Sequence, residues 1–276
     1  MKKSLLARLV VLVASLVAAP SIALANPRNL PFTYNASTSA RGHLEVEQFV
    51  DIIPVRLERE LPDGTAESTL VPRYELQTEL EYGLTDRLEY GLYFAFRQGA
   101  TVDTPFLRFQ GIKQRLRWRF SCPEWPVQLA AYGEVATFHD EIEVEEKLIL
   151  DYRAGRLRAA ANLWIEQEWY FVDDVTKYVY NPSAGVTYEI TPAFTVGGEY
   201  WVRGRFDDAS DDGTAGAGSG SPSGAHHYAG PTFMAQRGEY WIAAGVYARL
   251  DTLGRATAVD DQFGKVWVRL IAGIGL

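Results

Sequence analysis

The final twelve residues alternate between apolar and polar side chains almost without interruption. Successive side chains of a β-strand point to opposite faces, so this segment has one wholly apolar face and one charged face. The apolar face consists of Val266, Val268, Leu270, Ala272, Ile274 and Leu276, and the other contains Lys265, Trp267, Arg269, Gly273 and Gly275. This pattern is typical of a membrane β-barrel, in which the apolar face meets lipid and the polar face meets the lumen.

The same period of two recurs along the chain. Segments 72–83 and 87–97 both alternate, and only Gly83-Leu84-Thr85-Asp86-Arg87 links them, so we expect a tight hairpin of neighbouring strands. The apolar phase of one later segment changes between Phe109 and Ile112, which predicts either a β-bulge or a strand that starts later. The predicted strands are 42–53, 72–83, 87–97, 106–120, 126–137, 142–153, 156–169, 178–190, 193–204, 227–236, 239–250 and 265–276.

These segments make an even number of strands, with connections that alternate in length. Short connections are expected at 83–87, 121–125, 154–155, 191–192 and 237–238, and longer ones at 54–71, 98–105, 138–141, 170–177, 205–226 and 251–264. Bacterial outer-membrane barrels have short periplasmic turns and long extracellular loops. Residues 41–276 are therefore predicted to form one all-β domain, a closed antiparallel transmembrane β-barrel of about 12 strands.

The start of the chain resembles an export signal. Lys2, Lys3 and Arg8 precede or flank an apolar core at 9–17, and Ala23-Leu24-Ala25 forms an A-x-A cleavage site, so residues 1–25 are predicted to be a signal peptide. Residues 26–40 show no strand period, and we expect an irregular segment that could lie in the lumen as a plug. We expect localisation to the outer membrane of a Gram-negative bacterium.

Charge and cysteine content narrow the classes of partner. The net charge changes from −8 to −11 on cleavage, because three of the 27 basic residues and none of the 35 acidic residues precede residue 26. This balance argues against nucleic acid as a partner. Cys122 is the only cysteine, and beside Pro123 it is best interpreted as an unpaired turn residue.

The inward faces of the predicted strands carry most of the charge. Rows of cations in a narrow lumen require ion pairing with carboxylates on neighbouring strands, and segregated charge would set a transverse field along a water-filled pore. The alternative is that the charged rows only fill and rigidify the interior. The candidate pore-lining residues are Lys113, Arg115, Arg117 and Arg119 with Glu75, Glu79, Glu81, Glu89 and Glu134.

Catalytic and metal-binding patterns are weak. None of the histidines His43, His139 and His227 is followed by the Ser-Asn of barrel phospholipases, and the Asp-rich 205–226 loop with His226 is only a loose analogue of outer-rim proteases. Adjacent His226 and His227 would point to opposite sides of an extended chain and cannot share one ion. We therefore expect no enzyme, no metal site and no cofactor. The Asp- and Gly-rich composition of the 205–226 loop predicts that this loop is mobile.

The predicted hairpin also carries a family resemblance. Tyr82-Gly83-Leu84-Thr85-Asp86-Arg87-Leu88 resembles the turn "YG(I/L)TDRLE" that is frequent in proteobacterial outer-membrane barrels, of which the nearest type is the meta-pathway phenol-degradation transporters. The resemblance implies a barrel that admits small organic solutes. Many such proteins end in phenylalanine, whereas this chain ends in Leu276.

The function predicted from these observations is a narrow porin-like channel for passive passage of small solutes. The alternatives are an outer-membrane enzyme that acts on lipid or peptide, and a non-conducting structural or binding barrel. The expected partners are outer-membrane lipids and lipopolysaccharide, small solutes and the barrel assembly machinery. A monomer is expected by default, because no strand shows an additional flat apolar surface.

Overall fold

The computed structural model describes residues 26–60, 64–98, 107–172, 174–206, 225–251, 253 and 264–276. The predicted signal peptide and nearly all of the predicted 205–226 loop lie outside these residues. Within the described parts of the chain, no helix is long and apolar enough to cross a bilayer.

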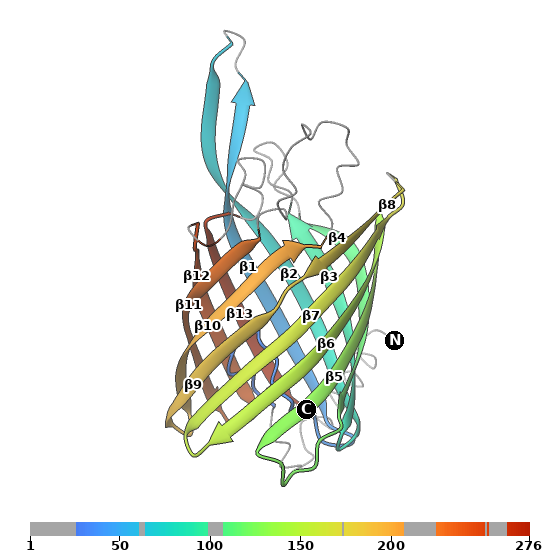
Figure 1. Cartoon of the computed structure of the whole chain (residues 1–276), viewed down its shortest axis with the longest axis vertical. Helices are drawn as coiled ribbons and strands as arrows, with labels where there is room; N and C mark the ends of the chain where they lie inside the picture. The colour runs from blue at the N-terminus through green and yellow to red at the C-terminus, as the bar shows by residue number, and fades with distance from the viewer. Residues whose placement is uncertain are drawn as a thin grey trace, which may run out of the picture.

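The described residues form a closed antiparallel barrel (Figure 1), which confirms the predicted all-β fold. Its strand segments are β1 (Leu44–Glu60), β2 (Ala66–Thr85), β3 (Leu88–Gln98), β4 (Leu107–Arg119), β5 (Val127–Phe138), β6 (Glu141–Ala154), β7 (Leu157–Tyr170), β8 (Val175–Tyr180), β9 (Ser183–Thr191), β10 (Phe194–Arg205), β11 (His226–Arg237), β12 (Tyr240–Arg249) and β13 (Val266–Gly275).

The barrel closes through the two ends of the strand sequence. Strand β1 pairs with β13 from Glu45 opposite Gly275 to Ile52 opposite Val268, and β10 pairs with β11. Closure leaves no strand edge in hydrocarbon, where unpaired N–H and C=O groups would be costly. The end of the barrel that carries the β2–β3 hairpin is called the turn end, and the opposite end is called the loop end.

Strands β8 and β9 occupy one position in the barrel, so the closed barrel has twelve strand positions. Both lie between β7 and β10, and Asn181 and Pro182 separate them. Pairing continues across the interruption, because Asn181 N donates to Trp164 O (3.0 Å) and Val202 N donates to Pro182 O (3.0 Å). Proline has no N–H to donate to the ladder, which accounts for the break in the predicted 178–190 strand.

The predicted loop at 54–71 is wrong over most of its length. Strands β1 and β2 continue as a paired hairpin that rises beyond the other strands (Figure 1), with Pro54 opposite Pro72. The prediction ended the first strand at residue 53 and began the second at residue 72. Strand β13 pairs with β1 only as far as Ile52, and β3 pairs with β2 only as far as Glu75. Proline is tolerated on such edges because it interrupts no second ladder.

Of the two alternatives expected for the fourth strand, the structure shows the β-bulge. Ala95 pairs with Gly111 whereas Phe96 pairs with Phe109, so Gln110 is the additional residue on β4. The register shift restores the alternation on either side of the bulge. Consequently Lys113, Arg115 and Arg117 share the inward face.

The two faces of the barrel wall have the predicted character. Outward positions carry large exposed apolar side chains, for example Leu116, Val135, Leu148, Ile165 and Val246. Inward positions carry buried carboxylates and guanidinium groups together with tyrosine and tryptophan rings. The interior of the barrel is thus polar and aromatic, and the apolar surface faces outward as lipid requires.

Candidate functional site

Residues 26–40 lie inside the barrel, where they form no helix or strand and most are buried. The trace of this segment runs within the lower half of the barrel in Figure 1. Its far end is at the turn end, because Thr38 Oγ1 donates to Asp86 O (3.0 Å) and Arg41 N donates to Asp86 Oδ1 (3.1 Å) in the β2–β3 hairpin. The lumen is therefore occupied at this end by a piece of the chain that is not part of the wall.

The backbone of this segment is hydrogen-bonded to wall side chains. Phe32 N and Thr33 N both donate to Glu199 Oε1 (3.0 and 2.5 Å). Tyr34 N donates to Asn162 Oδ1 (2.8 Å), and Asn162 Nδ2 returns a bond to Tyr34 O (2.9 Å). An irregular peptide has no ladder of its own, so its buried N–H groups need such acceptors. Further bonds run from Ala36 N to Asp151 (3.2 Å) and from Ser39 N to Glu89 (2.7 Å).

Aromatic packing holds the middle of the segment. The Phe32 ring stacks on Trp201 with centroids 4.4 Å apart and meets Tyr247 (5.1 Å) and Trp267 (5.9 Å) edge-on. Such offset and edge-to-face pairs are the preferred aromatic arrangements. The segment is thus anchored by both backbone hydrogen bonds and ring contacts.

The beginning of the segment meets a buried carboxylate. Asn26 N donates to Glu45 Oε2 (2.9 Å), and Glu45, which is fully buried, also accepts a bond from Trp241 Nε1. No ion pair of Glu45 with a basic side chain occurs among the described residues. Cleavage after Ala25, as predicted from the sequence, would place a charged α-amino group beside this carboxylate.

We predict that the α-amino group of the cleaved protein is shielded by Glu45. An exposed α-amino group reacts with amine-selective esters near neutral pH ahead of lysine side chains. Glu45→Gln removes the charge-assisted partner and should accelerate this labelling on the order of tenfold, measured by peptide mass spectrometry. The Nζ of Lys265, whose side chain is 70% exposed, is the internal reference. Equal labelling rates in both proteins would contradict the prediction.

A buried ion network lies beside residues 26–40, which are called the plug segment. It joins Arg28 of the segment to wall residues of β1–β4, and every side chain in it is at most 6% exposed. Three guanidinium groups face four carboxylates, so charges are nearly balanced in a region that excludes water. The members are Arg28, Arg115, Arg117, Glu47, Glu79, Glu81 and Glu89.

Arg115 is the centre of the network. Its guanidinium group contacts Glu79 through Nε (2.7 Å), Glu89 through Nη1 (2.6 Å) and Glu81 through Nη2 (2.8 Å). Arg117 Nη2 lies 3.0 Å from Glu81 Oε1 and 2.8 Å from Glu89 Oε1. Arginine can serve several carboxylates at once because its planar group carries five N–H donors.

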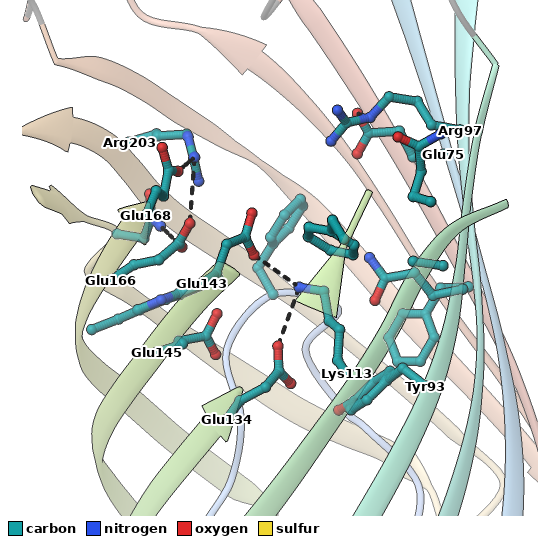
Figure 2. A pocket seen from close by; sticks show the side chains of 18 of the residues that line it. Glu75, Tyr93, Arg97, Lys113, Glu134, Glu143, Glu145, Glu166, Glu168 and Arg203 are labelled. Atoms are coloured by element: carbon teal, nitrogen blue, oxygen red, sulfur yellow. Dashed lines mark hydrogen bonds and ion pairs between the residues drawn. The ribbon is translucent and has the colours of Figure 1, made fainter. Parts of the chain in front are cut away.

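A polar cavity of about 470 Å³ lies on the other side of the plug segment, which contributes Phe32 and Tyr34 to its lining. Its walls differ in charge. Carboxylates from β5, β6 and β7 line one side, as Figure 2 shows, and arginines from β2, β3 and β13 line another. The acidic wall contains Glu134, Glu143, Glu145, Glu166 and Glu168. The basic wall contains Arg73, Arg97 and Arg269, of which Arg73 and Arg97 both pair with Glu75 (3.3 Å each).

Cations bridge the acidic wall at two points. Lys113 Nζ lies 3.1 Å from Glu134 Oε1 and 3.7 Å from Glu143 Oε2, and its side chain reaches into the cavity (Figure 2). Arg203 Nη2 lies 2.7 Å from Glu168 Oε1 and 3.6 Å from Glu166 Oε1. A third cation, Lys147, lies 2.5 Å from Glu145 Oε1, so three cations serve the five carboxylates and the wall keeps an acidic character.

The structure separates the nine candidate residues into three places. Lys113, Glu75 and Glu134 line the cavity. Five others, Arg115, Arg117, Glu79, Glu81 and Glu89, meet in the buried ion network and are not part of the cavity lining. Arg119 lies at the turn end, where its Nη2 donates to Asp86 O (3.0 Å). That all nine line a conducting path remains a prediction.

The candidate list missed most cations of the site, among them Lys147, Arg203 and Arg28 as well as Arg73, Arg97 and Arg269 of the basic wall. The inward orientation of Lys147 and Arg203 could have been predicted from the sequence. Each lies an even number of residues from an inward glutamate of its own strand, Glu145 on β6 and Glu199 on β10. Lys147 Nζ lies over the Trp164 ring (3.8 Å), a cation–π contact. Arg28 had no such signal, since it belongs to an irregular segment.

Two groups of carboxylates have oxygens close enough together to share an ion, Glu47 with Glu79 and Glu81, and Glu143 with Glu166 and Glu168. Arginine or lysine nitrogens already contact both groups: Arg28 and Arg115 in the first, Arg203 and Lys113 in the second. These contacts supply the positive charge that the carboxylates require. The Asp-rich loop considered for catalysis lies outside the described residues.

The fold is similar to those of two solved outer-membrane proteins. The porin NanC matches over 84% of this chain and 100% of its own, with a TM-score of 0.54 and 9% identity. An outer-membrane channel from Pseudomonas putida F1 matches over 87% of this chain and 98% of its own, with a TM-score of 0.59 and 9% identity. No protein-family model matches the sequence, and no curated protein matches it. At these identities the likeness shows the fold, that of an outer-membrane β-barrel.

Proposed function

We propose that this chain is a narrow porin-like channel of the outer membrane for passive passage of small solutes. One observation carries the proposal: the closed barrel holds a cavity of about 470 Å³ lined by charged and aromatic side chains, and part of its floor is a peptide segment rather than the wall. The volume lies in the range of small-molecule sites. A solute would pass from this cavity along or past the plug segment.

The charge distribution supports selective passage. An acidic wall on β5–β7 faces arginines of β2, β3 and β13 across the cavity, so a solute would experience a transverse field. Ion pairs such as Lys113 with Glu134 narrow the path. We therefore expect small conductance and dependence on solute charge.

The solutes that we propose are small organic molecules. The hairpin motif at Tyr82–Leu88 supports this class through its resemblance to phenol-degradation transporters. The cavity lining supports it physically, because aromatic rings offer stacking surfaces beside charged groups. The aromatic lining residues include Tyr93, Tyr132, Trp164, Trp201 and Trp267.

Lipid and assembly partners are also part of the proposal. The outward apolar band would contact the acyl chains of phospholipid and lipopolysaccharide. Strand β13, with its alternating apolar and polar side chains, would be the segment that the barrel assembly machinery recognises. No enzymatic activity is proposed, because histidine and carboxylate side chains do not form a catalytic arrangement in the described cavity lining.

Recordings in planar bilayers test the channel directly. The native protein should give discrete current steps, and Lys113→Gln should raise the cation-to-anion permeability ratio, because Glu134 and Glu143 then lose their shared cation. Arg153→Gln is the matched control, since Arg153 pairs with Glu189 on the exposed surface outside the cavity and should leave the ratio unchanged.

The absence of current steps and of solute flux into liposomes, for the native chain and for a chain without the plug segment, would overturn the channel. The second candidate function would then apply, a non-conducting binding barrel. The buried ion network favours that alternative, because its side chains exclude water from the region beside the plug.

A further inference from the structure

Glu146 is a carboxylate on the outward face of the barrel. Its strand neighbours Glu145 and Lys147 are buried and point inward, whereas Glu146 is exposed and pairs with Gly133 on β5 and Ile165 on β7. Ile165 is 50% exposed among the outward apolar side chains. The alternation of β6 therefore places one acidic side chain on the face that lipid covers.

The position of Glu146 is close to the middle of the lipid-facing band. Along β6, outward Ile142 lies four residues toward the loop end and outward Tyr152 lies six residues toward the turn end. With about 3.3 Å per residue and a tilt of roughly 40°, these residues span the height of a typical apolar band, about 25 Å. A carboxylate at this depth is costly and marks a functional site whose partner must be identified.

The chain itself does not provide that partner. The carboxylate of Glu146 makes no hydrogen bond or ion pair with any residue in the ranges that the structure describes. Its surroundings on the outer surface are apolar. They include Leu116, Val135, Leu148, Leu163 and Ile165, each at least 40% exposed.

A second polar side chain, Gln114 of β4, also faces outward. Tyr90 Oη donates to Gln114 Oε1 (3.0 Å), and the amide N–H₂ of Gln114 has no partner among the described residues. On the intervening β5, Gln114 is opposite Val135 and Glu146 is opposite Gly133, and the tilt of the strands offsets this difference of two residues, so the two side chains lie at similar depth. They are two strand spacings apart, about 10 Å, and cannot bond within one barrel.

The surface between them is hollow. Gly133 of β5 lies between the two strands, and a Cβ added there would meet nothing within 4 Å. A depression of about 910 Å³ covers this area, and its lining includes Leu116, Trp118, Leu148 and Ile165. Bare backbone at Gly133 permits close approach of another protein surface.

We propose that the outer face of β4–β6 is an interface with a second copy of this chain in the membrane. Both copies insert in the same orientation, so a two-fold axis must run along the membrane normal. An axis beside β5 would bring Gln114 of each copy to Glu146 of the other. Isologous interfaces require such self-complementary donors and acceptors at equal depth. This dimer replaces the monomer expected from the sequence, and it does not depend on conduction.

Cysteine cross-linking in native outer membranes tests the interface. Gly133→Cys in a Cys122→Ser background places a thiol near the proposed axis, because Cys122 is the only native cysteine. Mild oxidation should yield a covalent dimer of twice the chain mass. Val246→Cys in the same background is the matched control, since Val246 is 49% exposed on β12, six strand positions from β5 in either direction. It should yield monomer.

The polar contacts are tested in the Gly133→Cys background. Gln114→Leu or Glu146→Leu should lower the dimer yield on the order of tenfold, because both symmetric contacts are lost. Leucine on the lipid face favours the folded barrel, and heat-modifiable gel mobility verifies folding. The proposal is overturned by cross-linking equal to that of Val246→Cys, by a product with another protein, or by a yield that neither leucine variant changes.

Discussion

A chain that lacks residues 27–38 and carries Glu47→Gln is expected to conduct ions at a severalfold higher level than the full-length protein. The deletion removes the segment that occupies the lumen near the turn end, including the Phe32 ring stacked on Trp201. Glu47→Gln is added because Arg28, its partner at 2.8 Å, is deleted with the segment. An uncompensated buried carboxylate would otherwise destabilise the barrel. Single-channel recordings at matched salt measure the effect.

The full-length chain with Glu47→Gln alone is the control for this deletion. It retains the plug segment and its bonds to Glu199 and Asn162, so its conductance should match that of the native protein. If the deletion variant and this control conduct equally, the segment leaves the lumen in the native channel and does not limit passage. Circular dichroism of both proteins verifies that the barrel is intact.

Replacement of Arg115 by leucine is expected to cost about 3–5 kcal/mol of folding free energy. The Arg115 side chain is fully buried and contacts three carboxylates, so its loss leaves Glu79, Glu81 and Glu89 with too little positive charge. Unfolding by urea in lipid vesicles, with tryptophan fluorescence as the readout, measures the change. Arg117 belongs to the same buried ion network, so its substitution is expected to change the folding free energy more than the ion selectivity.

Arg153→Leu is the control for this substitution. Arg153 also pairs with a glutamate, Glu189, but its side chain is 66% exposed, and exposed pairs contribute about 0–1 kcal/mol. If Arg115→Leu fails to fold, Arg115→Lys keeps the charge and should show a smaller loss. A loss below about 1 kcal/mol for Arg115→Leu would mean that the network contributes nothing beyond a surface pair.

The candidate site was predictable in part. Period-two alternation predicted inward positions for Lys113, Glu75 and Glu134, and these side chains line the cavity. The alternation could not distinguish these residues from Arg115 or Glu79, which also point inward but lie in the buried ion network. The difference arises because Arg28 reaches this network from an irregular segment that has no period.

The strand pattern was sufficient for the barrel itself. Alternation in each segment, the even number of strands and the short connections follow from local side-chain geometry and from the need to leave no open edge in lipid. The predicted loop at 54–71 was wrong, because β1 and β2 continue to pair with each other through Pro54 and Pro72 where no further strand flanks them.

Contacts between strands were decided only by the tertiary structure. Arg203 of β10 meets Glu168 of β7, and Arg115 of β4 meets Glu79 of β2, through the register and tilt of strands that are not neighbours in the barrel. The similar depth of Gln114 and Glu146, which are opposite Val135 and Gly133 on β5, has the same origin. An alternating segment specifies the side of the wall on which a residue lies, because that property is local. Its height and its partner depend on how all strands are staggered around the closed barrel.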